Sequence, residues 1–234
     1  MLTGIDFEAL PGKTTAIIGS TGCGKSTLVN LIPRFYDVTG GRVTIDGVDV
    51  REMDVHALRG MIGFAPQKGV LFSGTIASNI AYGAPDASEE QIREAAEIAQ
   101  ASEFIESKPT KFESPIAQGG SNVSGGQKQR LSIARAIARA PRIYIFDDTF
   151  SALDFKTDAA LRRALGPKTQ DSTVLIVAQR ISTILYADQI LVLDDEGRLA
   201  GKGTHKELLA SCETYRQIAR SQLSEAELNQ KEGA

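Results

Sequence analysis

The sequence has few of the residues that build cross-links and transition-metal sites. It contains two cysteines, Cys23 and Cys212, and two histidines, His56 and His205, in 234 residues. Two cysteines exclude a disulfide framework and are typical of a protein kept in a reducing compartment. The histidines lie far apart in the sequence, which disfavours a metal site built on histidine.

Two further absences exclude whole classes of protein. No apolar run approaches the ~18–20 residues of a membrane-spanning helix, and the N-terminus has no signal-peptide pattern. We therefore expect any membrane role to depend on a partner or on a segment outside this sequence. Lys and Arg total 26 against 29 Asp and Glu, so no excess of positive charge indicates nucleic-acid binding. What remains, 42% hydrophobic and 24% charged residues, is the composition of a globular domain.

Strand and helix patterns alternate along most of the chain. Ile5 and Phe7 alternate with acidic residues and predict an opening strand, and the pair Asp46-Gly47 predicts the turn of a short hairpin over residues 42–50. Ser88 and Gln91 have the spacing of a helix capping box. Apolar runs predict buried strands at 15–18, 143–146, 174–177 and 190–193, and helical patterns cover 75–81, 88–101 and 126–139. The alternation predicts a parallel sheet with helices on its faces.

A glycine-rich segment lies between the first buried strand and the helix after it. It has the pattern G-x-x-x-x-G-K-[ST], in which glycines let backbone N–H groups face phosphates and the helix N-terminus favours the same negative charge. We expect Lys25 to reach the β- and γ-phosphates and the Ser26 hydroxyl to bind Mg²⁺. The alternative is an ordinary glycine turn before Lys-Ser. The expected nucleotide-binding residues are Gly19, Ser20, Thr21, Gly22, Cys23, Gly24, Lys25, Ser26 and Thr27.

An acidic residue completes the expected metal site. The apolar strand 143–146 ends in Asp147, and a carboxylate at the carboxyl edge of a parallel sheet is placed to hold the Mg²⁺ shell. Taken alone, an acidic residue after a buried strand is common. Together with the glycine-rich segment, it is the expected magnesium partner.

A second glycine motif identifies a family. Val123-Ser124-Gly125-Gly126-Gln127 resembles the signature motif of ATP-binding-cassette (ABC) ATPases, with Val123 in place of a leucine. On its own the motif could be a turn that caps a helix through Ser124. The resemblance implies that it contacts the γ-phosphate of ATP held by the opposite subunit of a head-to-tail dimer.

Other segments match the family in the expected order, from Leu2 to about Leu223. Gln67 resembles the Q-loop glutamine, which contacts Mg²⁺ and couples to transmembrane domains. Ser151-Ala152-Leu153-Asp154 resembles the D-loop at the dimer interface. The resemblance implies ATP and Mg²⁺ as cofactors and a second nucleotide-binding domain as partner. It implies an α/β fold with a P-loop NTPase (RecA-like) core and antiparallel β subdomain (1–67 and 141–223), an inserted α-helical subdomain (68–140) and a frayed tail (224–234).

Within the family the chain resembles exporters. The segments 71–80 and 203–209 are similar to the exporter sequence after the Q-loop and to the entry into its C-terminal helix. Exporters usually carry a transmembrane domain before this cassette, which implies a nucleotide-binding domain at the cytoplasmic face of the membrane. The aromatic residue on which adenine stacks in the family is expected upstream of this chain.

Two positions depart from the family pattern. Asp148 stands where the family has the glutamate that polarises the attacking water, and Gln179 stands in place of the switch histidine. Aspartate sets its carboxylate back by one methylene, and an amide cannot carry a positive charge or relay a proton. With Lys25, these are the expected catalytic residues. The changes resemble the degenerate half of a heterodimeric exporter, with low turnover in the isolated chain and a signature motif that completes the partner's site.

Other functions remain open in principle. A homodimeric ATPase that tolerates both changes is the main alternative, since Asp148 could act through an extra water. Two non-transport ABC ATPases are disfavoured. A chromosome-maintenance head would need a long coiled coil, and only about 55 residues of ordinary helical sequence separate Gln67 from Val123. A ribosome-associated factor usually has two cassettes in tandem, and this sequence shows one. A small-molecule kinase or a GTPase would not explain the signature motif. The transported substrate cannot be read from this sequence.

Overall fold

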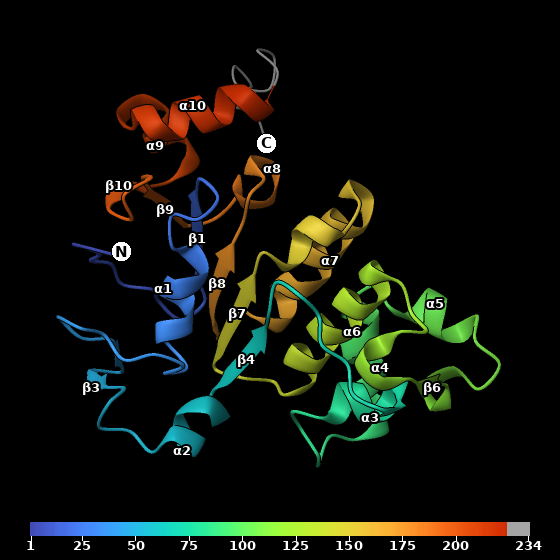
Figure 1. Ribbon diagram of the computed structural model, residues 1–234. Coiled ribbons are helices and arrows are strands. Elements are labelled where there is room, and N and C mark those ends of the chain that lie inside the picture. Colours follow the sequence, from blue (N-terminus) through green and yellow to red (C-terminus); the bar gives the residue numbers. More distant parts are fainter. Residues whose placement is uncertain (224–234) are drawn as a thin grey trace.

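A six-stranded sheet forms the centre of the molecule (Figure 1) in the strand order β10-β9-β1-β8-β7-β4. The computed structural model describes residues 1–223, so the expected frayed tail lies outside the described residues. Neighbouring strands from β9 to β4 are parallel, and β10 pairs with β9 in the antiparallel sense. The expected α/β fold is confirmed. The strands are β1 (Thr14–Gly19), β4 (Ile62–Ala65), β7 (Ile143–Asp147), β8 (Thr173–Val177), β9 (Gln189–Leu193) and β10 (Leu199–Gly203).

Helices cover both faces of the sheet. Because successive residues of a strand point to opposite sides, neighbouring residues pack into different core clusters. Ile17 of β1 belongs to a core cluster with Leu28 and Leu58 of the helices on one face. Its neighbour Ile18 belongs to a second, larger cluster on the other face. The first face is covered by α1 (Lys25–Leu31) and α2 (Val55–Gly60), and the second cluster includes residues of α6 (Gly125–Ala138), α7 (Phe155–Lys168), α8 (Ile181–Ile184), α9 (His205–Ser211) and α10 (Glu213–Gln222).

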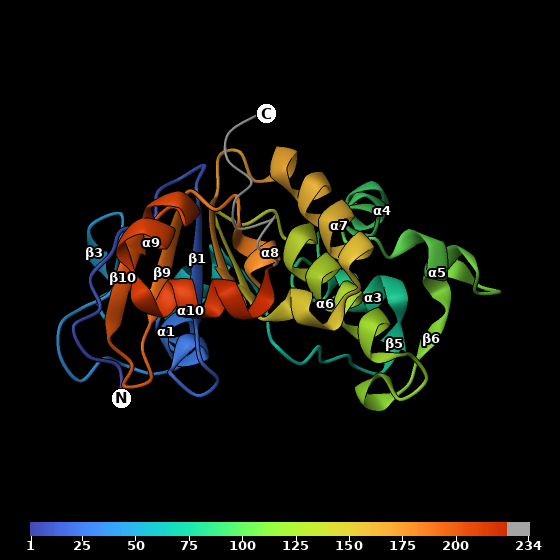
Figure 2. The same ribbon diagram turned by 90° about the horizontal axis from the view of Figure 1, so that it is seen from above.

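The chain between β4 and β7 is mainly helical and lies to one side of the sheet (Figures 1 and 2). Ser88 and Gln91 form the expected capping box at the start of α4. That helix ends before the predicted Ala101, and Gln100 after it has a left-handed φ of 56°. The division of the chain into subdomains stays a prediction. This segment contains β5 (Gly74–Thr75), α3 (Ile76–Ala81), α4 (Glu89–Ile98), α5 (Ser102–Glu106), β6 (Pro115–Ile116) and α6, with short 3-10 turns at Lys111–Glu113 and Gln118–Gly120.

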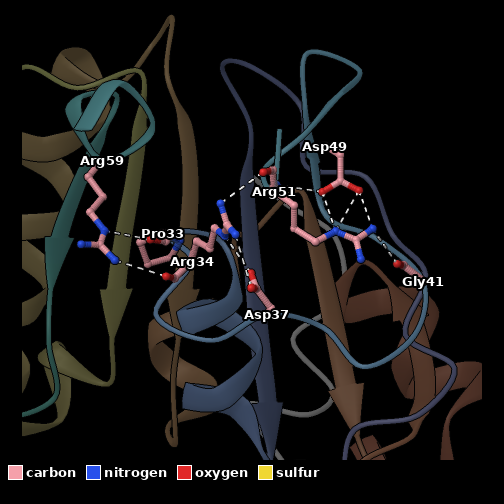
Figure 3. A network of polar contacts seen from close by, with 7 residues as sticks. All are labelled: Pro33, Arg34, Asp37, Gly41, Asp49, Arg51 and Arg59. Atoms are coloured by element: carbon pink, nitrogen blue, oxygen red, sulfur yellow. Dashed lines mark hydrogen bonds and ion pairs between the residues drawn. The ribbon is translucent and has the colours of Figure 1, made fainter. Parts of the chain in front are cut away.

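The predicted hairpin around Asp46-Gly47 is confirmed as β2 (Thr44–Ile45) and β3 (Val48–Asp49), which pair antiparallel. A polar network ties this hairpin to the end of α1 (Figure 3). Arg59 donates to the carbonyl oxygens of Pro33 and Arg34, at 3.1 and 3.2 Å, and Arg34 donates to that of Arg51. The Arg51 guanidinium in turn lowers the pKa of the Asp49 carboxyl to about 2. The segment after α1 is therefore held by side-chain hydrogen bonds in addition to the pairing of β2 with β3.

The opening strand predicted from Ile5 and Phe7 is wrong. Both side chains pack against the first core cluster, as the alternation indicated, but the backbone there is not in a strand. The local pairing is a single bridge between Thr3 and Arg198. Alternation reports which side chains are buried, whereas a strand also needs a neighbouring backbone.

We predict that Gly63→Ala destabilises the domain. A Cβ atom at Gly63 of β4 would lie 2.6 Å from the carbonyl oxygen of Ala136 in α6 and 2.6 Å from Pro141 Cγ. Because a backbone atom cannot move aside cheaply, we expect a loss of about 1–3 kcal/mol in the free energy of unfolding, measured by chemical denaturation. Gly60→Ala is the control, since the nearest atom there is a flexible Arg139 nitrogen at 3.7 Å. Equal stability of the two variants would contradict the close approach.

Candidate functional site

The glycine-rich segment forms a tight loop between β1 and α1. Gly22 and Gly24 have φ angles of 87° and 104°, in the left-handed region that other residues avoid. Gly24 is also the N-cap of α1 and leaves the first turn without a side-chain cap. The Lys25 ammonium donates to the carbonyl oxygens of Gly19 and Ser20, at 2.7 and 2.6 Å. The loop thus combines uncapped N–H groups with a lysine charge, which is the chemistry of an anion site.

Ser20 has a partner that the sequence did not indicate. Its hydroxyl donates to a carboxylate oxygen of Asp195 at 2.5 Å. Asp195 lies in the turn between β9 and β10, 175 residues away in sequence. The contact ties the exposed rim of the loop to the far edge of the sheet.

The structure brings the side chains of Ser26 and Asp147 together. The Ser26 hydroxyl donates to Asp147 Oδ1 at 2.8 Å. Burial raises the pKa of the Asp147 carboxyl, and the charge of Asp148 raises it further, while the Ser26 hydrogen bond and Lys25 oppose the shift. A buried carboxylate beside a hydroxyl suits a hard cation that brings its own charge. The oxygen donors of Ser26 and Asp147 are of the kind that Mg²⁺ binds. Residues 1–223 contain no cluster of three or more His, Cys, Asp or Glu that could hold a metal.

Asp148 is the centre of the site. Its Oδ2 accepts hydrogen bonds from the amide nitrogens of Gln67 at 3.1 Å and Gln179 at 2.6 Å. The residue is 4% exposed, and its φ of 50° is left-handed, a conformation that aspartate tolerates better than most residues. Its backbone N–H donates to the carbonyl oxygen of Val177. The structure therefore brings together three predicted site residues from three separate segments, with one carboxylate oxygen already carrying two donors.

The signature motif begins α6. Ser124 is the N-cap, its hydroxyl accepts from the Gln127 N–H at 3.2 Å, and the Gln127 side-chain oxygen accepts from the Ser124 N–H at 3.0 Å. Val123 is buried and Gly125 is exposed. Gly126 lies beside the D-loop, because a Cβ there would be 3.7 Å from the carbonyl oxygen of Ala152. The motif thus presents a glycine helix start at the surface.

The predicted D-loop connects Asp148 to α7. Ser151 and Ala152 lie in a 3-10 turn (Thr149–Ala152), Leu153 follows, and Asp154 caps α7 through the Thr157 N–H. Arg180 holds this loop by donating to the carbonyl oxygens of Ser151 and Leu153, both at 3.1 Å. Sequence reasoning missed Arg180. Its position directly after Gln179 is the only signal that could have indicated it.

Gln129 is a second residue that the sequence analysis missed. It lies on α6, two residues after the signature motif, and is 2% exposed. Its amide nitrogen donates to the Pro66 carbonyl oxygen and its amide oxygen accepts from the Gly69 N–H, each at 3.0 Å. The two bonds bracket Gln67, so the signature helix holds the backbone on both sides of the Q-loop glutamine.

The fold and the site together define a nucleotide-binding domain of the P-loop class. Residues 2–151 match the family model described as ABC transporter, and the chain belongs to this family. The chain is 51% identical over 225 residues to an uncharacterized ABC transporter ATP-binding protein of Mycobacterium tuberculosis, covering 95% of this chain and 38% of that protein. It is 44% identical over 224 residues to an ATP-dependent lipid A-core flippase of Chromobacterium violaceum, covering 96% and 38%.

A solved structure supports the same fold. The chain is similar to a bacterial Atm1-family ABC exporter with ATP bound, with a TM-score of 0.91 and 40% identity, over 96% of this chain and 39% of that one. The chain thus spans less than two fifths of the length of these curated relatives and of this structure. No helix among residues 1–223 is long and apolar enough to cross a membrane.

We predict that Asp147→Asn stabilises the nucleotide-free domain and weakens its response to Mg²⁺. The raised pKa means that the folded state holds the Asp147 proton more tightly than the unfolded state. The buried charge therefore costs stability as the pH rises above the ordinary carboxyl pKa, and the amide removes that cost. Loss of the carboxylate charge beside Ser26 should weaken Mg²⁺ binding with ATP by roughly 10- to 100-fold.

Thermal melting of the nucleotide-free protein and ATP titrations with and without Mg²⁺ measure the two effects. A variant that melts lower than the unaltered chain at neutral pH would contradict the pKa assignment. A variant with an unchanged Mg²⁺ requirement would contradict the metal assignment.

Proposed function

We propose that this domain couples ATP binding and hydrolysis to export of a substrate across a membrane. In this proposal its own ATP site hydrolyses slowly, and its signature motif completes the site of a partner cassette in a head-to-tail heterodimer. The observation that carries the proposal is the Asp148 carboxylate, whose Oδ2 is held by the amides of Gln67 and Gln179.

Binding of ATP at the chain's own site follows from the loop geometry. The ammonium of Lys25, now shared between two loop carbonyl oxygens, would turn to the β- and γ-phosphates. Ser26, Gln67 and Asp147 would hold Mg²⁺ beside the nucleotide. The ion would neutralise charge that develops on the phosphates during transfer.

Slow hydrolysis follows from what surrounds the attacking water. An aspartate reaches about 1 Å less far than a glutamate, and such a misplacement can cost around 10²-fold in rate. Gln179 donates its N–H to Asp148 at 2.6 Å, which draws the carboxylate toward the switch segment. The amide can neither protonate nor relay a proton. In this proposal Asp148 and Gln179 keep the site's hydrogen bonds in place but are poor at activating the attacking water.

Completion of a partner's site follows from the signature motif. Ser124 and Gln127 satisfy one another, and the N–H groups of Gly125 and Gly126 begin a helix of 14 residues. A helix N-terminus of this length favours a phosphate. A Cβ at Gly126 would lie 3.7 Å from the carbonyl oxygen of Ala152, and this closeness of the signature motif and the D-loop supports a shared role in the proposed dimer.

A transmembrane partner would dock on the helical side of the molecule. The rings of Phe72 and Tyr82 stack at 4.2 Å and are 40% and 61% exposed. The guanidinium of Arg135 lies 5.2 and 5.5 Å from the two ring centroids and fixes them. Rigid exposed aromatic side chains are typical anchors of a protein interface. The flippase and exporter names of the relatives support export, and with it a position at the cytoplasmic face of the membrane.

We predict that the double variant Asp148→Glu with Gln179→His raises ATP turnover of the assembled pair by at least about tenfold at this chain's own site. The longer carboxylate and the imidazole restore water orientation and proton relay. The measurement is ATP hydrolysis with Mg²⁺ in the presence of the partner cassette. No gain in turnover, or brisk hydrolysis by the unaltered chain alone, would favour a competent homodimer instead.

We predict that Ser124→Arg abolishes the partner-dependent ATPase while this chain's own ATP affinity stays within about twofold. A bulky cation at the helix start would fill the position of the partner's γ-phosphate. Ser107→Arg is the control, since Ser107 is an exposed serine whose hydroxyl bonds only the nearby Phe104 carbonyl oxygen. If the Ser124 variant retained the partner-dependent ATPase, the signature motif would not complete the partner's ATP site.

A further inference from the structure

The switch segment that carries Gln179 is held from the C-terminal helix. Gln222, the last residue of α10, donates its amide N–H to the carbonyl oxygen of Gln179 at 2.8 Å. The same amide accepts the N–H of Ile181, also at 2.8 Å. One planar group thus bridges the backbone on both sides of Arg180, as a neighbouring strand would.

The contact also completes a helix. Ile181 is the first residue of α8, whose N-cap Arg180 gives no side-chain cap. The Ile181 N–H would be one of the unsatisfied donors of that helix start, and Gln222 satisfies it from 41 positions away. Figures 1 and 2 both show the C-terminal end of α10 beside α8. The Gln222 side chain therefore caps the N-terminus of α8 from another helix and fixes the direction in which residues 179 and 180 leave the sheet.

Both residues on the bridged segment hold parts of the ATP site. The Gln179 side chain bonds Asp148 Oδ2 at 2.6 Å. The Arg180 side chain holds the D-loop carbonyl oxygens of Ser151 and Leu153. A change in the backbone at 179–181 would move both contacts, because each depends on the direction of its side chain.

We propose that Gln222 is a positioning residue for ATP hydrolysis, which acts from α10 by fixing the switch backbone. This inference rests on the proposed function only in treating Asp148 and Gln179 as groups at the hydrolytic centre. Gln222 itself is exposed and touches neither the glycine-rich loop nor Asp148 through any contact described for residues 1–223. Its effect should therefore fall on the hydrolytic step rather than on ATP affinity.

The test uses the assembled transporter with the partner's water-orienting carboxylate neutralised, so that the remaining hydrolysis belongs to this chain's site. Single-turnover hydrolysis of labelled ATP and equilibrium ATP binding are measured for Gln222→Ala. Loss of both bridging bonds should lower the single-turnover rate constant about three- to tenfold and leave the ATP Kd within about twofold. An unchanged rate, or a weakened Kd with a lowered melting temperature, would overturn the proposal.

A matched control lies on the same helix. Gln217 is also exposed, and within residues 1–223 its amide bonds only Glu213 of α10, at 3.3 Å. Gln217→Ala should leave both the rate and the Kd unchanged. Gln222→Glu keeps the acceptor for the Ile181 N–H and loses the donor to Gln179, so its rate should lie between those of the unaltered chain and Gln222→Ala. Equal effects of the two glutamine-to-alanine changes would make α10 a structural element only.

A double variant decides whether the effect passes through the switch. In a Gln179→Ala background, Gln222→Ala should have a clearly smaller effect on the rate than in the unaltered chain, because only the route through Arg180 and the D-loop remains. A full effect in that background would overturn the proposed route. Failure of the proposed function would look different: the unaltered chain alone would hydrolyse ATP briskly as a homodimer, and the comparison between Gln222 and Gln217 would still hold there.

Discussion

Parallel pairing of β1, β8, β7 and β4 is the constraint on which the site depends. Val177 pairs with Ile17 on one side and with Asp147 on the other, so β7 and β8 end level and β1 continues two residues further to Gly19. Backbone hydrogen bonds extend this pairing past the strand ends, since the N–H of Asp148 donates to the carbonyl oxygen of Val177 and the N–H of Ala178 donates to that of Ile17. In open α/β sheets, ligands bind outside the carboxyl ends of the strands. The glycine-rich loop, Asp147 with Asp148, the switch glutamine and the Q-loop all leave the sheet at this edge, and four segments remote in sequence become one site.

Concentrating these groups has an electrostatic cost. Asp147 and Asp148 are adjacent carboxylates, 5% and 4% exposed, and burial with mutual repulsion raises the pKa of Asp147. The chain offsets the charge with the hydroxyl of Ser26 and two amide donors rather than with a salt bridge at either residue. Lys25 is occupied by loop carbonyl oxygens. Asp147 and Asp148 thus carry negative charge that no salt bridge balances within residues 1–223, and Lys25 bonds neutral groups. This arrangement suits a ligand that brings both a phosphate for Lys25 and a cation for the carboxylates.

Much of this could be predicted from the sequence, and what could be predicted was local. The strands at 143–146, 174–177 and 190–193 are apolar throughout because both faces of the sheet are covered, and Asp46-Gly47 and Ser88 with Gln91 carry their turn and cap within a few residues. Motif order brought Gln67, Asp148 and Gln179 onto the same list of candidate residues. The contacts that position them were missed. Gln129, Arg180 and Gln222 bond to backbone groups, and every residue has a backbone carbonyl oxygen, so the sequence does not mark these partners. The false strand at Ile5 and Phe7 has the same origin, because a side-chain pattern cannot show where the partner backbone lies.

The contacts made by Gln129 and Arg180 connect the signature motif to the surroundings of Asp148. Gln129 lies on the helix that begins with the signature motif and brackets Gln67, while Arg180 follows Gln179 and holds the D-loop beside Gly126. A displacement of α6 would therefore reach Asp148 by two routes, one through the Q-loop and one through the D-loop and switch. Contiguous contacts of this kind provide a path, and coupling needs in addition that the path have two arrangements. Both routes end at Asp148, whose Oδ2 accepts hydrogen bonds from the side-chain amides of Gln67 and Gln179. Turning that carboxylate toward a water exchanges two amide hydrogen bonds for others and leaves the strands in place.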